Sequence, residues 1–172
     1  MRGLTDAVRH GCLIVLLAVA SMLVACDVKN ISELEEGVST EADVRERFGT
    51  PEAVWEGEDG AQIYEYNRQP AGHVNYMITI GPDGRMSALR QVLTERNFAR
   101  VLPGMAMEEV RRMLGKPMKI TTYALKRETH YDWRYMDGNN QSDSKVFTVV
   151  FDPDLRVIRT MSVPDPDLER NR

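Results

Sequence analysis

The sequence predicts an α+β protein with two similar units behind a signal peptide, each made of two helices followed by an antiparallel sheet. Three observations lead to this fold class. One pattern of residues occurs in both halves of the chain, apolar and polar residues alternate in several short segments, and Pro-Asp turns separate some of those segments. Strands that follow a run of helices are typical of α+β folds in which helices cover one face of an antiparallel sheet.

Each half contains the same short helix pattern. A valine, a bulky apolar residue four positions later, a glycine and a proline occur in this order: Val44, Phe48, Gly49 and Pro51, then Val110, Leu114, Gly115 and Pro117. Residues four apart share a helix face and can be buried together. Glycine just past a helix end, with proline behind it, ends the helix. Ser39, Thr40 and Glu41 offer a cap and a negative charge to the first helix.

A shorter helix is expected before each of these, over residues 31–36 and 95–102. Alternation then predicts strands in the first half over 62–67, 74–80 and 86–94, and in the second half over 120–124, 129–135, 145–151 and 157–163. The larger apolar residues align between the halves and define the core face: Tyr76, Ile78 and Ile80 with Phe147, Val149 and Phe151. The opposite face of the first sheet is expected to be partly solvated.

The matches occur in the same order in both halves, which indicates a tandem duplication. The segment YMITIGPDGR at 76–85 corresponds to FTVVFDPDLR at 147–156. We therefore expect a first unit at 31–94, a second unit at 95–163 and a flexible charged tail at 164–172.

The amino terminus predicts export and lipid attachment at Cys26. Arg2 and Arg9 precede an apolar run from Leu13 to Val24, which is shorter than the ~20 residues of a spanning helix and is typical of a signal peptide. The sequence Leu-Val-Ala-Cys at 23–26 resembles the lipobox of bacterial lipoproteins. This resemblance implies a signal at 1–25, palmitate-type acylation of Cys26 and a short tether at 26–30.

Charge and cysteine content exclude several other classes of protein. The formal net charge is −4, and a mildly acidic chain gives no reason to expect nucleic-acid binding. Cys12 lies in the predicted signal and Cys26 is expected to carry lipid, so no disulfide is expected in the mature chain.

No catalytic or cofactor site is evident in the sequence. His73 and His130 fit a turn and a strand, and no phosphate loop or nucleophile motif is present. Asp152 and Asp154 fit a turn better than a calcium loop. We therefore expect neither an enzyme nor a bound cofactor, metal or small-molecule substrate.

Aromatic residues on the predicted strands are the candidate partner-binding surface. They are Trp55, Tyr64, Tyr66, Tyr131, Trp133 and Tyr135. Tyrosine and tryptophan are enriched in interface hot spots. The alternative is that these rings fill the cores of two small units.

The second copy carries a family resemblance, through Gly104, Met105, Glu109, Val110, Leu114, Gly115 and Pro117 followed by aromatic strands. It resembles the SmpA/OmlA (BamE-like) family of envelope lipoproteins. The resemblance implies an adaptor that binds protein components of outer-membrane β-barrel assembly and supports envelope integrity. It also implies a protein anchored through Cys26 and facing the periplasm.

Two features leave alternatives open. A tandem of such units is also similar to the secreted β-lactamase inhibitor protein, so an inhibitor-like binder of a periplasmic enzyme is the second hypothesis. Asp27 resembles an inner-membrane retention signal of enteric bacteria, whereas the family implies the outer membrane. The sequence identifies neither the partner nor the packing of the two units.

Overall fold

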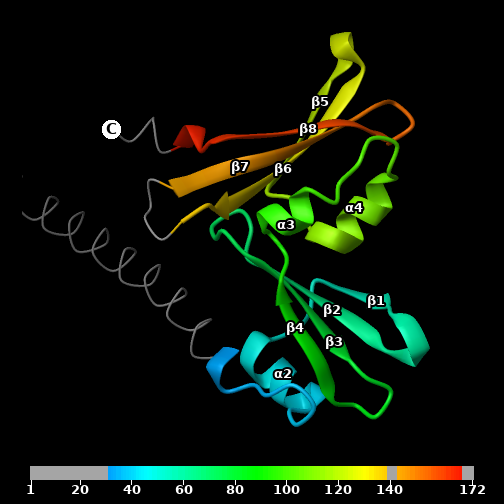
Figure 1. Ribbon diagram of the computed structural model, residues 1–172, viewed down its shortest axis with the longest axis vertical. Helices are drawn as coiled ribbons and strands as arrows, with labels where there is room; N and C mark the ends of the chain where they lie inside the picture. The colour runs from blue at the N-terminus through cyan, green and yellow to red at the C-terminus, as the bar shows by residue number, and fades with distance from the viewer. Residues whose placement is uncertain (1–30, 139–142, 168–172) are drawn as a thin grey trace, which may run out of the picture.

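A computed structural model describes residues 31–138 and 143–167. The chain forms two four-stranded antiparallel sheets in an α+β arrangement, ordered β1-β2-β3-β4 and β5-β6-β7-β8. The sheets lie at the two ends of the long axis, with helices α3 (Glu95–Phe98) and α4 (Met107–Leu114) between them (Figure 1). Helix α2 (Glu41–Phe48) lies beside the first sheet, at the lower end of Figure 1.

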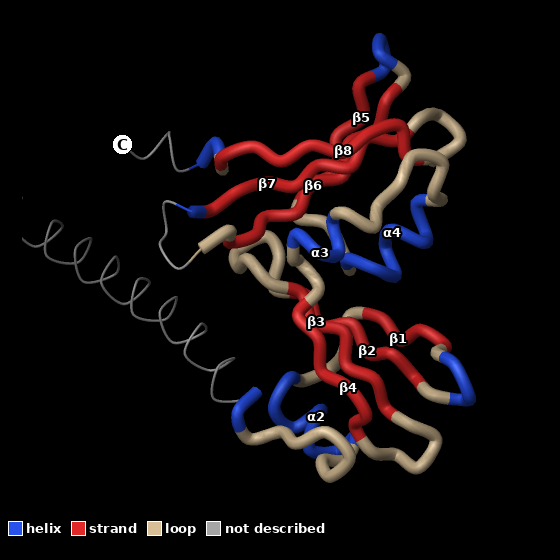
Figure 2. Tube along the Cα trace, viewed as in Figure 1, coloured by secondary structure: helices blue, strands red, loops and turns tan. Residues whose placement is uncertain are grey.

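The first sheet consists of β1 (Ala53–Glu56), β2 (Gln62–Asn67), β3 (Asn75–Ile80) and β4 (Met86–Gln91). The second consists of β5 (Lys119–Tyr123), β6 (Glu128–Met136), β7 (Ser144–Phe151) and β8 (Val157–Pro164). The strands of each sheet follow one another along the chain, and Figure 2 shows them as two separate groups. The short 3-10 turns η1 (Glu58–Gly60) and η2 (Ala124–Lys126) join β1 to β2 and β5 to β6.

Each sheet has its own apolar core beneath a helix. In the first, Val44 and Phe48 of α2 pack against Tyr76, Ile78 and Ile80. In the second, α3 and α4 cover the corresponding residues of the sheet, which include Phe147, Val149 and Phe151. The predicted core faces of β3 and β7 are therefore confirmed.

Capping geometry explains where α2 begins and ends. Thr40 Oγ1 accepts a hydrogen bond from the Asp43 amide at 3.3 Å, and Asp43 Oδ2 accepts one from the Thr40 amide at 2.8 Å. Gly49 ends α2 with a φ of 81° and Gly115 ends α4 with a φ of 77°. The predicted cap and helix-ending glycines are thus confirmed.

Two local expectations were wrong, and one strand was missed. Residues 33–38 form turns and irregular structure rather than the helix predicted over 31–36. The helix predicted over 95–102 ends at Phe98. Strand β1 was not predicted, because Ala53–Glu56 has only four residues and joins the sheet by pairing with β2 rather than through a strong alternation of its own.

The same backbone contacts occur in both units. The Gly37 amide donates to Met86 O and the Gly104 amide to Val157 O, each at 2.8 Å. Isolated bridges join Thr40 to Arg85 in one unit and Ala106 to Arg156 in the other. These contacts join the loop before each main helix to the last strand of its sheet in the same way in both units.

Candidate functional site

The second unit packs against part of the face of the first sheet opposite α2. Alternation along β2 points Tyr64 and Tyr66 to the α2 side and Glu65 to the other side. Glu65 is fully buried and Met77 on β3 is 7% exposed. The face is partly solvated as expected, since Thr79 is partly exposed, but Glu65 is buried because Arg111 of α4 and Lys116 behind it pack there.

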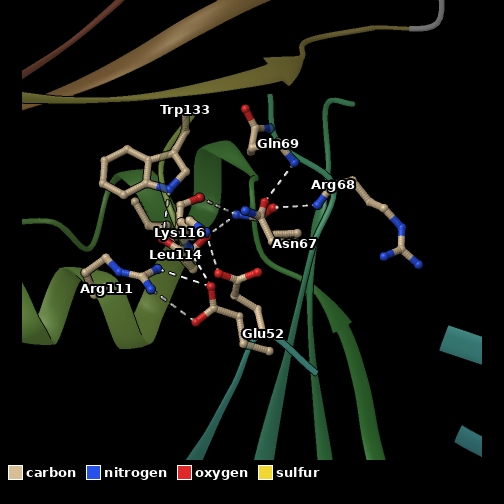
Figure 3. Close-up of polar contacts among 11 residues, drawn as sticks. Glu52, Asn67, Arg68, Gln69, Arg111, Leu114, Lys116 and Trp133 are labelled. Carbon is tan, nitrogen blue, oxygen red and sulfur yellow. Dashed lines mark hydrogen bonds and ion pairs between the residues drawn. The ribbon is translucent and has the colours of Figure 1, made fainter. Parts of the chain in front are cut away.

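Glu65 is the charged centre of this contact. Its Oε1 atom accepts a hydrogen bond from the Lys116 amide at 2.6 Å, and Arg111 Nη1 lies 3.2 Å from the same oxygen. Figure 3 labels Arg111 and Lys116. Lys116 also forms an exposed ion pair with Glu52. A buried carboxylate needs such partners, because desolvation without them is costly. The second unit therefore supplies the positive charge and the hydrogen-bond donor that the buried Glu65 carboxylate of the first unit needs.

Asn75 satisfies the end of α4. Its side-chain amide donates to Leu114 O at 2.8 Å and to Lys116 O at 3.2 Å, and Trp133 Nε1 donates to Gly115 O at 3.0 Å (Figure 3). The last carbonyls of a helix have no partner within the helix. Here a residue of β3 supplies hydrogen bonds to them, so the helix terminus and the first sheet are fitted to one another.

A second contact joins the loop between β2 and β3 to the second sheet. Strand β6 continues to Met136, whereas β5 begins opposite Asp132. The end of β6 beyond Asp132 therefore has no β5 residue beside it, and Gln69 binds there. Its Nε2 donates to Arg134 O at 2.8 Å and its Oε1 accepts from the Arg134 amide at 3.1 Å. The side-chain amide therefore replaces the backbone of an additional strand residue.

His73 lies at the same contact. Its Nε2 atom is 3.0 Å from Ser144 Oγ, and that hydroxyl donates to Asp165 Oδ2 at 2.9 Å. Because the Ser144 proton goes to Asp165, His73 Nε2 acts as the donor. Burial, followed by the charge of Arg134, lowers the pKa of His73. The neutral form of His73 thus suits this contact.

Most of the candidate aromatic residues lie in the cores. Four of them are at most 2% exposed: Tyr64, Tyr66, Trp133 and Tyr135. These four rings therefore fill the cores, which was the alternative to a partner-binding surface. Tyr131 is partly exposed and contacts Phe151 edge-on. Trp55 is also partly exposed, with the guanidinium of Arg112 over its ring at 5.5 Å. Trp55 therefore belongs to the contact between the units.

The exposed apolar side chains are concentrated in the second unit. Only Val38 and Val54 belong to the first, and the others are Leu102, Ile120, Tyr123, Leu125, Leu155, Ile158, Met161 and Val163. The β5–β6 hairpin projects from its sheet (Figure 1). At its tip Leu125 is fully exposed, Tyr123 is 43% exposed, and Lys126 lies over the Tyr123 ring.

Charged groups of the second sheet form ion pairs. Arg159 donates two hydrogen bonds to Glu128, and these, with one from His130, lower the pKa of Glu128 to about 2. Within residues 31–138 and 143–167, no group of acidic, histidine or cysteine side chains could hold a metal ion. The same residues contain no helix long and apolar enough to span a membrane.

Some residues singled out in the sequence lie outside the described part of the structure, and some contact residues were not predicted. Cys26 and Asp27 are outside the residues that the structure describes. Glu65, Asn75 and Arg111 were not predicted as contact residues. The available signal was an acidic residue between two core tyrosines of β2, which is unusual for a strand buried on both faces.

One family model matches the second half of the chain. Residues 91–161 match the family model described as the outer membrane protein assembly factor BamE domain. No curated protein matches the sequence.

Two solved structures align with most of the chain. One, from Streptococcus mutans, is described as a beta-lactamase inhibitor protein: TM-score 0.32, 11% identity, 73% of this chain and 82% of that one. The other is the DUF4309 family protein YjgB from Bacillus subtilis: TM-score 0.29, 21% identity, 77% of this chain and 83% of that one.

Proposed function

We propose that the protein, whose residues 91–161 match the BamE domain model, is an adaptor of outer-membrane β-barrel assembly and acts by binding protein partners. The family match is the observation that carries this proposal. BamE is an assembly factor of the outer membrane, so the family supports a place on its periplasmic side.

The β5–β6 hairpin is the proposed partner-binding element. It combines a fully exposed Leu125 and a half-exposed Tyr123 with Lys126 and Arg127. Exposed apolar residues beside fixed charges suit a protein surface that offers an apolar depression and acidic groups. The burial of Tyr64, Tyr66, Trp133 and Tyr135 leaves this hairpin as a better candidate than the core aromatics.

We further propose that Cys26 anchors the chain by lipid. Two or three acyl chains hold a protein stably on a bilayer without a spanning helix. Only residues 27–30 separate this cysteine from the first described residue, so the domain would stay close to the membrane. The family favours the outer membrane and Asp27 the inner one, which fractionation would decide.

The proposed role is tested by crosslinking and purification from native envelopes. Wild-type protein should recover barrel-assembly components, and Leu125→Asp should lose most of that recovery. Val54→Asp is the matched control, because Val54 is 47% exposed on the first sheet. Recovery of a stoichiometric periplasmic enzyme instead, with no assembly defect in a deletion strain, would replace this proposal by the inhibitor-like alternative.

The anchor is tested separately. Labelling with palmitate should give a labelled wild-type protein and an unlabelled Cys26→Ser variant. Equal labelling of the two proteins would contradict lipid attachment at Cys26, whatever the partner experiment shows.

A further inference from the structure

The last strand of the second sheet is an exposed edge. Seven of the eight residues of β8 are exposed, and only Val157 is buried. The corresponding strand of the first unit, β4, is exposed at only two of its six residues. Both strands are the last in their sheets, so each presents one hydrogen-bonding edge that no strand of its own sheet covers.

In the first unit, a carboxylate occupies the edge of β4. Glu36 Oε1 accepts a hydrogen bond from the Leu89 amide at 3.0 Å, and Glu36 also pairs with Arg90. The Leu89 amide therefore points away from β3 and is satisfied by the side chain of Glu36. Covering an edge strand in this way prevents it from pairing with another chain.

The second unit has no equivalent of this carboxylate. The shared contacts align Gly37 with Gly104 and Met86 with Val157, which places Pro103 where the first unit has Glu36 and Thr160 where it has Leu89. The proline side chain has no hydrogen-bond acceptor. Among the described residues, the Thr160 amide has no carboxylate in the place that Glu36 takes.

The direction of the β8 amides follows from the pairing with β7. The Asp165 amide donates to Ser144 O at 3.0 Å, and Val163 and Met161 lie opposite Val146 and Thr148. Hydrogen-bonded and non-hydrogen-bonded pairs alternate along an antiparallel ladder. Asp165, Val163 and Met161 therefore bond inward to β7, while Thr160 and Ser162 direct their amide and carbonyl groups outward.

We propose that β8 is the pairing edge for a second copy of this chain. The two β8 strands would run antiparallel about a two-fold axis at Met161. Thr160 of each copy would then form hydrogen bonds with Ser162 of the other copy. The sheet would then continue across both molecules. This proposal goes beyond the proposed function and does not depend on it.

The length of the free edge sets the register. A bulge in the β7–β8 pairing lies between Val150 and Phe151, opposite residues 157–159, and Pro164 lacks an amide at the other end. Met161 is midway between Ile158 and Pro164. A two-fold axis at Met161 therefore pairs the whole available stretch with its copy.

Charge and exposure suit a second copy of the same strand. Arg159 would face Val163 of the other chain rather than another arginine, and its guanidinium already bonds Glu128 at 2.8 and 3.0 Å. Met161 is 37% exposed and Val163 is 43% exposed, and pairing would cover both. Strand β5, another edge, is shorter and begins with Lys119, and lysine is a residue that disfavours edge pairing.

Site-specific disulfide formation in the full-length protein tests the register. In a non-hydrogen-bonded pair, the Cα atoms of Met161 and its copy would lie about 4.5 Å apart, within the range that a disulfide bridges. Met161→Cys should therefore give a disulfide-linked dimer under mild oxidation. Val163→Cys is the matched control. In the proposed register residue 163 lies opposite residue 159 of the second copy, so the two introduced cysteines would be four positions apart, about 14 Å along the strand.

A third variant tests the role of the edge amide. Thr160→Pro removes an outward amide without removing a bond to β7, and should abolish the Met161→Cys crosslink while circular dichroism shows a folded protein. Proline is tolerated on an edge strand when its amide position faces outward.

The outcomes separate clearly. A crosslinked homodimer of Met161→Cys, above the level of Val163→Cys and of the wild-type chain with its native cysteines, supports the pairing. Equal crosslinking of the two variants, a crosslink to a different protein, or a monomer at all concentrations in sedimentation would overturn it.

Discussion

Leu155 and Gly84 show how one backbone position tolerates different residues in the two units. Both follow a Pro-Asp sequence in the turn before the last strand, and both have a left-handed backbone, with φ of 56° at Leu155 and 76° at Gly84. A residue with a side chain is strained in this conformation by roughly 1–2 kcal/mol, whereas glycine is not.

Exchanging the two residues should therefore have opposite effects. Gly84→Leu should lower the free energy of unfolding by about 1–2 kcal/mol, and since a Cβ at Gly84 meets no atom within 4 Å, the loss reports backbone strain. Leu155→Gly relieves this strain and should raise the free energy of unfolding. The gain should be no more than about 1 kcal/mol, because glycine also increases the entropy of the unfolded chain. Urea denaturation measures both. A stabilising Gly84→Leu would contradict the argument.

His73 is expected to make stability depend on pH. Burial and Arg134 lower its folded pKa, while the unfolded value is about 6.5. The unfolded state therefore binds more protons between the two pKa values, so the free energy of unfolding should fall as pH decreases below about 6.5. Asp165 and Ser144 face the same ring.

His73→Gln keeps a donor for Ser144 and removes this titration. Denaturation at pH values between 7.5 and 5 should give a shallower loss of stability for the variant than for the wild type. Identical slopes for the two proteins would show that His73 does not titrate against folding.

For single residues, the hydrophobic pattern of the sequence predicts which side chains are buried in a core, but it does not predict which polar side chains contact one another. Tyr76, Ile78 and Ile80 could be assigned to a core because alternation fixes the face of a strand residue. The role of Glu65 could not be predicted, because its partners Arg111 and Lys116 are far along the sequence. Burial of Trp133 was equally undecided, because an aromatic strand residue serves a core or an interface.

The two main helices differ in their amino-terminal caps. In α2, Thr40 and Asp43 exchange hydrogen bonds. In α4, Glu109 Oε2 accepts from the Ala106 amide at 2.7 Å, but alanine has no side-chain acceptor for the return bond. Half of the capping arrangement is therefore missing from the second unit.

Substitutions at the two N-cap positions should change the free energy of unfolding measured by thermal denaturation. Thr40→Ala should cost about 1 kcal/mol, and Ala106→Ser should contribute about 0.5–1 kcal/mol, because an N-cap hydroxyl accepts a helix amide. Ala106→Gly serves as a control that adds no hydroxyl. Destabilisation by Ala106→Ser would show that this side chain cannot reach the helix amide.

Elements with a strong local pattern were predicted closely, and weak ones were not. Strand 62–67 was predicted with its observed bounds, because its last four residues alternate between tyrosine and polar residues before a turn. Strand β1 owes its pairing to β2, and residues 33–38 turn so that the Gly37 amide reaches Met86 O. Both outcomes depend on contacts that are distant in sequence.

The contact between the units is a property of the whole molecule. Glu65 accepts the Lys116 amide and faces Arg111, so removing its carboxylate would leave donors unsatisfied. Glu65→Ala should lower the free energy of unfolding by about 1–3 kcal/mol. Glu65→Gln, which keeps an acceptor oxygen, should lose less. Chemical denaturation that ranks Gln below Ala would contradict this account.

Gly115 and Gly49 provide a matched test of whether the two units are fitted together. Both glycines end a helix, with φ near 80° and extended ψ values of −173° and −153°, a region that is essentially restricted to glycine. A Cβ on Gly115 would lie 2.9 Å from Asn75 Nδ2 and 3.3 Å from Glu65 Oε1, whereas one on Gly49 meets nothing within 4 Å. Gly115 therefore permits the close approach of α4 to the first sheet.

Alanine at either position should cost about 1–3 kcal/mol of backbone strain, and Gly115→Ala should cost more because it also separates the units. The wild type should unfold in one transition, since buried polar contacts couple the sheets. Gly115→Ala should separate the fluorescence transition of Trp55 from that of Trp133, followed in single-tryptophan variants. Gly49→Ala should lower the stability and keep the transitions together. Equal behaviour of the two variants would mean that the units are linked by the chain alone.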